Sequence, residues 1–132
     1  MTALGIHVLL ELYGCGYKEL NNVDGIKDTL LRATRLAGAT IVDSSFRKFQ
    51  PYGVSGVVII AESHITIHTW PEHGYAAVDV FTCGNEVMPQ RAVEEIVSAF
   101  KPKQFTSRTL KRGKITSATA KQHGQLALLL SA

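Results

Sequence analysis

Three of the five histidines of this chain lie within one dozen residues, 62–73, together with its single tryptophan. The segment reads ESHITIHTWPEH, and it directly follows the apolar run GVVIIA at residues 56–61. Such a run is typical of a strand that is buried on both faces. Serine, histidine and carboxylate groups are costly to bury without partners. Their position at the end of a buried strand therefore indicates a functional site that uses them.

Alternation along this segment separates two kinds of side chain. If the strand continues past residue 61, its side chains point alternately to opposite faces of the sheet. The isoleucines at 65 and 67 then require a hydrophobic layer, which we expect helices to provide. The other face carries Glu62, His64, Thr66, His68 and Trp70. This mixture of polar and aromatic groups predicts the wall of a site.

The residue types of the segment are compatible with four kinds of chemistry, which its spacing does not favour equally. A metal site is disfavoured because His64 and His68 lie about 13 Å apart on an extended strand, whereas zinc ligands converge within about 2.3 Å of one point. Ser63, His68 and Asp79 could form a hydrolase triad, but no Gly-x-Ser-x-Gly elbow is present. Phosphate-binding glycine loops are absent too. Ordinary core histidines would explain His64 or His68 singly, but not the whole cluster.

The fourth interpretation is that Ser63 reacts with its own backbone. A serine hydroxyl held against the preceding carbonyl can convert the Glu62–Ser63 amide into an ester. A base such as His68 can then remove the serine α-proton, which eliminates the ester and breaks the chain. Hydrolysis of the resulting dehydroalanine, with loss of ammonia, leaves a pyruvoyl group at the new N-terminus. This chemistry requires a strained serine, a base and a hydroxyl that steadies the oxyanion.

Length and composition limit the class of protein. The 132 residues are enough for one domain with a real core. No apolar stretch is long enough to cross a membrane, and the first residues lack the pattern of a secretory signal. Cys15 and Cys83 are far apart in the sequence, so we expect free thiols and a cytoplasmic protein.

Charge is distributed unevenly along the chain. Residues 1–100 carry seven Lys/Arg and eleven Asp/Glu, net −4, whereas residues 101–132 carry seven Lys/Arg and no acid, net +7. The basic part lacks the aromatic or helical pattern of a nucleic-acid-binding segment, so a solvated, flexible tail from 113 to 132 is expected. We expect neither a nucleic-acid nor a membrane partner.

The periodicity predicts an α+β fold. Helices are expected from Asn22 or Asp24 to about residue 37, and from Pro89 to a stop at Pro102. Strands are expected at residues 4–13, 40–49, 55–70 (with a break in it allowed), 75–83 and 104–110. These elements predict a two-layer sandwich whose mainly antiparallel sheet has both helices on one face. The other face needs cover, most simply from a second copy of the chain.

Three motifs give the chain a family resemblance. PYGVSG at 51–56, AESHITIHTWPE at 61–72 and AAVDVFTCG at 76–84 closely resemble the small bacterial and archaeal S-adenosylmethionine decarboxylases, which are pyruvoyl-dependent proenzymes. The likeness runs from about residue 4 to residue 100. The Ser/Thr/Lys-rich end beyond Gly113 departs from the family pattern, as does Arg47, where many relatives have histidine.

The resemblance implies a role for each matching residue. The proenzyme would cut itself between Glu62 and Ser63, giving a β chain of residues 1–62 and an α chain of 63–132 whose pyruvoyl group comes from Ser63. The substrate would form a Schiff base with this covalent cofactor and lose carbon dioxide, which supplies the aminopropyl donor for spermidine synthesis. The resemblance further implies two protomers packed sheet against sheet, and the spacing of the histidines leads us to expect no metal. The implied site consists of Ser55 and His68 for processing, Cys83 as proton donor, Phe49 and Trp70 against adenine, and Glu72 on the ribose hydroxyls.

Two other functions stay open at this point. Relatives of the family act on ornithine or arginine, and Arg47 is compatible with such a substrate, although Trp70 and Glu72 favour a nucleoside. A non-enzymatic ligand-binding relative is the second alternative. The retained Ser63, His68 and Cys83 argue against it.

Overall fold

A single six-stranded sheet forms the framework of the protein. The computed structural model describes residues 2–115, and its strands lie in the order β2-β3-β4-β5-β1-β6, every neighbouring pair antiparallel. Strand β1, the first in the chain, therefore lies between β5 and the last strand, β6. The strands are β1 (Thr2–Tyr13), β2 (Ile41–Lys48), β3 (Val54–Ile60), β4 (Ser63–Trp70), β5 (Tyr75–Cys83) and β6 (Gln104–Ile115).

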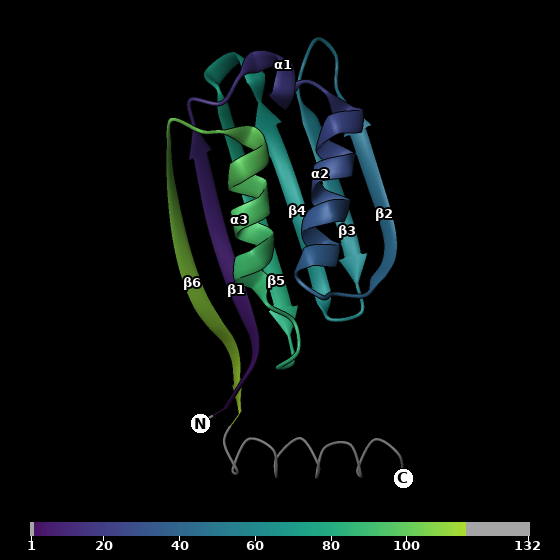
Figure 1. Ribbon diagram of the computed structural model, residues 1–132, viewed down its shortest axis with the longest axis vertical. Helices are drawn as coiled ribbons and strands as arrows, with labels where there is room; N and C mark the ends of the chain where they lie inside the picture. Colours follow the sequence, from purple (N-terminus) through teal and green to yellow (C-terminus); the bar gives the residue numbers. More distant parts are fainter. Residues whose placement is uncertain (1, 116–132) are drawn as a thin grey trace, which may run out of the picture.

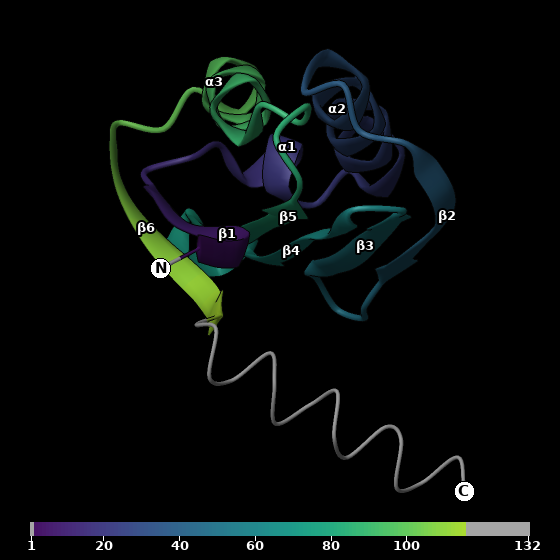
Figure 2. The same cartoon turned by 90° about the horizontal axis from the view of Figure 1, so that it is seen from below.

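Two long helices cover one face of this sheet. Figures 1 and 2 show α2 (Val23–Leu36) and α3 (Pro89–Phe100) side by side in a second layer. The short α1 (Tyr17–Leu20) and the 3₁₀ turn η1 (Pro71–His73) lie in connections. No helix within residues 2–115 covers the opposite face. The predicted two-layer α+β sandwich is confirmed.

The helix boundaries follow the predicted signals. The Asn22 side chain accepts a hydrogen bond from the Gly25 N–H at 3.1 Å, which caps the first turn of α2. Pro89 occupies the first turn of α3, where a proline costs no hydrogen bond. That helix ends at Lys101, in a left-handed conformation, directly before Pro102. Both predicted helices are confirmed to within about one residue.

The apolar side of β4 faces the helices, as the alternation predicted. Ile65 and Ile67 are fully buried and belong to one core cluster with Ile26 and Leu30 of α2 and Ile96 of α3. Full burial of such a side chain contributes about 1.5–3 kcal/mol relative to exposure. Hydrophobic packing therefore fixes which face of β4 is turned to the helices, and leaves the polar set on the uncovered face.

The uncovered face carries aromatic and apolar groups. The register places Ile59, His64, Phe81 and His7 in one row across β3, β4, β5 and β1 on this face. Ile59 is 45% exposed, and Trp70, farther along β4, is 40% exposed. Such a surface is more apolar than the outer face of an ordinary sheet.

One predicted strand is in fact two. The chain reverses at Ala61 and Glu62, so residues 55–70 form the hairpin of β3 and β4. The expectation that Glu62 shares a strand face with His64 was therefore wrong, because Glu62 lies in the turn. The sequence concealed the reversal because the apolar run of β3 leads directly into β4 and no Gly, Pro or Asn marks the turn.

The last strand is longer than expected. β6 continues to Ile115 because it pairs with β1 along nearly its whole length, from Thr2↔Ile115 to Tyr13↔Gln104. Residues 113–115 of the expected tail are thus part of the sheet, and residues 116–132 lie outside the described part. Cys15 is buried and Cys83 exposed, both as free thiols.

None of the helices in residues 2–115 is both long and apolar enough to span a lipid bilayer.

Candidate active site

Ser63 follows a very tight turn and has an unusual backbone. Because Ile60 and Ser63 pair across the hairpin, only Ala61 and Glu62 form its turn. The φ angle of Ser63 is 145°, in a region that is essentially reserved for glycine. A side chain held there costs about 1–3 kcal/mol, and such strain persists only where the surroundings impose it. The strained residue is the serine predicted to attack the carbonyl of Glu62.

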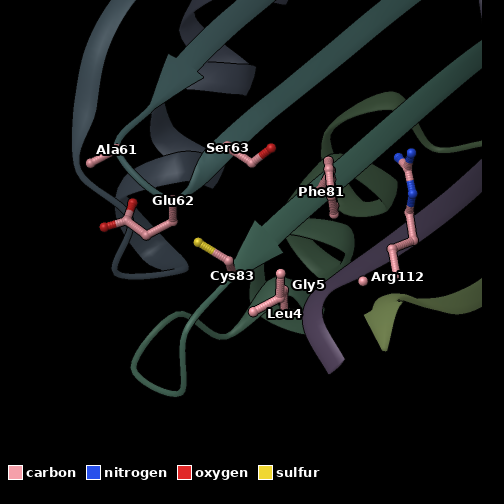
Figure 3. A pocket seen from close by; sticks show the side chains of 9 residues that line it. Leu4, Gly5, Ala61, Glu62, Ser63, Phe81, Cys83 and Arg112 are labelled. Carbon is pink, nitrogen blue, oxygen red and sulfur yellow. The ribbon is translucent and has the colours of Figure 1, made fainter. Parts of the chain in front are cut away.

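A cavity of about 400 Å³ lies beside this turn. Cys83, at the end of β5, lies on its wall together with Ser63. Figure 3 shows the Cys83 sulfur directed toward the turn that holds Glu62, and the Ser63 hydroxyl directed toward Phe81. The predicted reactive serine and proton donor thus share one cavity. The lining residues are Leu4, Gly5, Ala61, Glu62, Ser63, Phe81, Cys83, Arg112 and Gly113.

Gly5 leaves room for the aromatic wall of this cavity. A Cβ atom at position 5 would lie 2.6 Å from Cε1 of Phe81. The ring of Phe81 therefore lies directly over the β1 backbone. The guanidinium of Arg112, from β6, lies over the same ring, 4.7 Å from its centroid. This cation–π contact gives the cavity a positively charged side.

Ser55 and His68 form a second reactive pair. They lie opposite one another on β3 and β4, and Ser55 Oγ is 2.7 Å from His68 Nδ1. A hydroxyl beside an imidazole is the arrangement expected of a base with a hydroxyl helper. The two predicted processing residues are therefore in direct contact.

The predicted substrate-binding residues gather around this second pair. Phe49, Trp70 and Glu72 all line a cavity of about 250 Å³, and Ser55 and His68 line it as well. Trp70 is held against Tyr75, with ring centroids 5.3 Å apart. This cavity offers three aromatic side chains, of Phe49, Tyr52 and Trp70, and the carboxylate of Glu72.

Arg47 lies next to this group. It lines an adjoining cavity of about 290 Å³ to which Phe49, Ser55 and His68 also contribute. The residue that departs from the family pattern is thus close to the predicted adenine and processing residues. A guanidinium here can meet an anionic group of a ligand.

The two groups of site residues lie at opposite ends of β4. Ser63 and His68 are five residues apart on a continuous strand, which corresponds to about 17 Å. Within one chain His68 is too distant to remove the α-proton of Ser63. The hypothesis that His68 acts on Ser63 therefore requires the two residues to come from different protomers.

A polar network that the sequence reasoning did not predict lies between the two groups. His7 Nε2 is 2.9 Å from Asp79 Oδ1, and Thr66 donates to Asp79 Oδ2 at 3.3 Å. Arg112 Nη1 lies 3.4 Å from His7 Nδ1. The Asp79 of the rejected hydrolase triad is therefore paired with His7 and not with His68. Within residues 2–115, no three His, Cys, Asp or Glu side chains converge on a point suited to a metal ion.

His64 lies beside this network, and its pKa is lowered. Burial lowers the pKa of His64, and the nearby His7 lowers it further, against a weaker opposing effect of Asp79. His7 was not predicted because the sequence of β1 resembles an apolar strand with isolated polar residues, of which His7 is one. Arg112 was not predicted as a site residue because its segment resembles a basic tail. Both become site residues only through the pairing of β1 with β5 and β6.

Comparison with known proteins identifies the family. The sequence model described as S-adenosylmethionine decarboxylase matches residues 6–113, so the chain belongs to the S-adenosylmethionine decarboxylase family. It is 53% identical over 113 residues to the S-adenosylmethionine decarboxylase proenzyme of Carboxydothermus hydrogenoformans, covering 86% of this chain and 89% of that protein. It is 48% identical over 121 residues to the proenzyme of Thermodesulfovibrio yellowstonii, covering 92% and 90%. The resemblance inferred from the three motifs is confirmed.

Solved structures agree with this assignment. The adenosylmethionine decarboxylase of Aquifex aeolicus superimposes with a TM-score of 0.83 at 40% identity, over 89% of this chain and 97% of that chain. The Trypanosoma brucei AdoMetDC-delta26 monomer gives a TM-score of 0.61 at 18% identity, over 91% of this chain and 50% of that chain. The second likeness shows the fold alone, and one copy of the present fold matches half of the longer protein.

Proposed function

We propose that this protein is a carboxy-lyase that decarboxylates S-adenosylmethionine, supplying the aminopropyl donor for spermidine synthesis. One observation carries the proposal. In a member of this family, a serine with a strained backbone directly follows a hairpin turn and shares a cavity with a cysteine. A chain that only bound a ligand would have no need of this combination.

The proposed catalytic group is made from Ser63. Its Oγ attacks the carbonyl carbon of Glu62, the C–N bond breaks, and the hydroxyl proton ends on the released amine. Removal of the Ser63 α-proton then breaks the Cβ–Oγ bond, so that Glu62 leaves as a carboxylate and dehydroalanine remains. Addition of water and loss of ammonia give a pyruvoyl group on residue 63. The geometry fits this product, because residue 63 faces a cavity large enough for part of a substrate.

The side chains around residue 63 have separate tasks in turnover. A pyruvoyl ketone supplies an electron sink for the pair of electrons left when a carboxylate departs. Cys83, which lies on the wall of the same cavity, delivers a proton from Sγ to the carbon that loses carbon dioxide. Phe81 and Gly5 form an apolar part of the wall of this cavity. Phe49 and Trp70 bind the adenine ring, and Glu72 binds the ribose hydroxyls.

The complete site requires two protomers. Ser63 lies about 17 Å from His68 along β4, and the face that carries both groups has no cover within residues 2–115. An antiparallel packing of two such faces brings the Ser63 cavity of one protomer to the His68 cavity of its partner. It buries the apolar row of Ile59 and Phe81 and encloses a dry site, where fixed dipoles act most strongly. We therefore propose a homodimer with two shared sites.

The substrate assignment can be tested directly. Wild-type protein incubated separately with carboxyl-labelled S-adenosylmethionine, ornithine and arginine is expected to release labelled carbon dioxide only from the first, because Trp70 and Glu72 suit a nucleoside. Release from ornithine or arginine would instead assign the pocket beside Arg47 to a simple amino acid. Release from none of the three by fully cleaved protein would contradict the proposed enzyme activity.

Two variants should separate processing from turnover. His68→Ala is expected to block or slow cleavage of the chain, since it removes the base. Cys83→Ala is expected to cleave but to lose about 10²–10⁴-fold in kcat, the usual contribution of a positioned proton donor. Intact mass gives the first quantity, and labelled carbon dioxide per cleaved chain gives the second. A Cys83→Ala protein with normal cleavage and full kcat would contradict the role of Cys83.

A further inference from the structure

Within residues 2–115, the side-chain and loop hydrogen bonds that reach the turn before Ser63 from outside the hairpin come from Thr40. The Thr40 N–H donates to Glu62 Oε1 at 2.9 Å, and the Thr40 hydroxyl donates to Glu62 Oε2 at 3.2 Å. The Ala61 N–H donates to the Thr40 carbonyl at 2.9 Å. Every polar group of Thr40 is thus directed at the two turn residues. These three hydrogen bonds form what we call the Thr40 clamp.

The clamp is itself anchored to a rigid part of the fold. Thr40 follows the C-terminal end of α2 and directly precedes β2. The Ala39 N–H donates to the Thr34 carbonyl at 3.2 Å, and the Met88 N–H donates to the Ala37 carbonyl at 2.9 Å. The turn is therefore tied through Thr40 to the end of a packed helix.

Stability does not explain the clamp. Thr40 is exposed, and its bonds to Glu62 are exposed as well. A hydrogen bond of this kind contributes little to folding, because water replaces it in the unfolded chain. Ser63, by contrast, has a backbone conformation that persists only when its surroundings impose it. Two carboxylate oxygens fixed by one residue orient the Glu62 side of the peptide bond that Ser63 has to attack.

We propose that the Thr40 clamp positions the Glu62–Ser63 peptide bond for the first step of self-cleavage, and that Thr40 is a positioning residue for this step. The proposal rests on the self-cleavage proposed above. In that step the bond from Ser63 Oγ to the Glu62 carbonyl carbon forms while the C–N bond breaks. Attack requires Oγ close to that carbon and in line with its open face, and a misplacement of about 1 Å can cost on the order of 10²-fold in rate.

The test follows cleavage of newly made chains over time. Wild type, Thr40→Val, Thr40→Ser, Glu62→Ala and Thr109→Val are made in a cell-free reaction and quenched at intervals for intact mass. Thr40→Val and Glu62→Ala are expected to cleave at least about tenfold more slowly than wild type. Thr40→Ser retains the hydroxyl and should cleave nearly normally. Thr109→Val is the matched control on the exposed strand β6, and it should cleave at the wild-type rate.

Hydroxylamine distinguishes the affected step, because it cuts an ester but not an amide. His68→Ala should accumulate the ester and be cut at residue 62 by hydroxylamine, whereas Thr40→Val should resist. Chains of Thr40→Val that do cleave should show wild-type kcat, since Thr40 lines neither reactive cavity. A merely structural role would lower this kcat too, and a reduced value would contradict positioning.

The possible failures are distinguishable. If wild type does not cleave, the proposed function fails and the clamp fails with it. If wild type cleaves and Thr40→Val or Glu62→Ala cleaves equally fast, the clamp alone is wrong. Should Thr40→Val not fold, as judged by circular dichroism, Glu62→Ala decides the question by itself.

Discussion

The Ser63→Ala protein is expected to remain one intact chain of 132 residues and to have no decarboxylase activity. Alanine retains the Cβ atom, so the turn and its strained backbone are preserved as far as a side chain allows. It lacks Oγ, so it can neither attack the Glu62 carbonyl nor give a pyruvoyl group. The loss should be complete, because no described neighbour of residue 63 can supply a ketone.

Intact mass and labelled carbon dioxide measure this outcome together. Wild type should give two chains, residues 1–62 and 63–132. The second chain should be lighter than its encoded sequence by the mass of one ammonia molecule, because a pyruvoyl group replaces the N-terminal serine. Ser107→Ala, a serine change on the exposed strand β6, is the matched control and should cleave and turn over normally. A wild-type protein that stays intact and still decarboxylates would exclude the pyruvoyl mechanism.

The turn that makes Ser63 reactive is also the part of the fold that the sequence concealed. The turn of a two-residue hairpin is normally recognisable in the sequence as Asn-Gly or a similar pair, because these residues accept positive φ at little cost. Here the turn residues are Ala61 and Glu62, and the positive φ falls on Ser63. A sequence that relieved the strain would have marked the turn with glycine. Local residue propensities could not reveal this turn, because its residues do not favour the conformation they adopt. The resulting strain is what the proposed chemistry uses.

Other features of the fold could be predicted from the sequence because they depend on local residue patterns. The alternation of Ile65 and Ile67 with His64, Thr66 and His68 indicated the buried and open faces of β4 correctly. Asn22 and Pro89 marked the helix starts for reasons of backbone hydrogen bonding that act within one turn. Such signals need no knowledge of the tertiary fold.

Features that depend on distant pairing were not readable. His7 meets Asp79 across 72 residues of sequence, and Arg112 meets His7 across 105. Both contacts exist because β1 inserts between β5 and β6, which no local pattern specifies. The contact of Ser55 with His68 likewise depends on the register of a hairpin whose turn was not recognised. The family motifs named the two residues, but only the fold brings them together.

The separation of Ser63 from His68 leads to the second large effect. If the base that acts on Ser63 belongs to the partner protomer, a defective chain can be repaired by a partner with a different defect. A His68→Ala chain retains a normal Ser63 and lacks its base. A Ser63→Ala chain retains a normal His68 and cannot be cleaved itself. In a mixed dimer, one of the two shared sites combines the intact serine with the intact histidine.

Co-expression of His68→Ala with a mass-tagged Ser63→Ala chain is therefore expected to produce cleaved His68→Ala chains. His68→Ala alone should stay largely intact, because both sites of its dimer lack the base. The matched control pairs His68→Ala with the double variant Ser63→Ala/His68→Ala, which forms the same mixed dimer but supplies no histidine, and no repair should follow. Intact mass identifies the cleaved chain, and native mass spectrometry verifies that mixed dimers are present.

If mixed dimers form and His68→Ala stays intact in them, His68 does not act across the interface. A fully active wild-type monomer in sedimentation would exclude the shared site altogether, since about 17 Å of β4 separates the two residues within one chain.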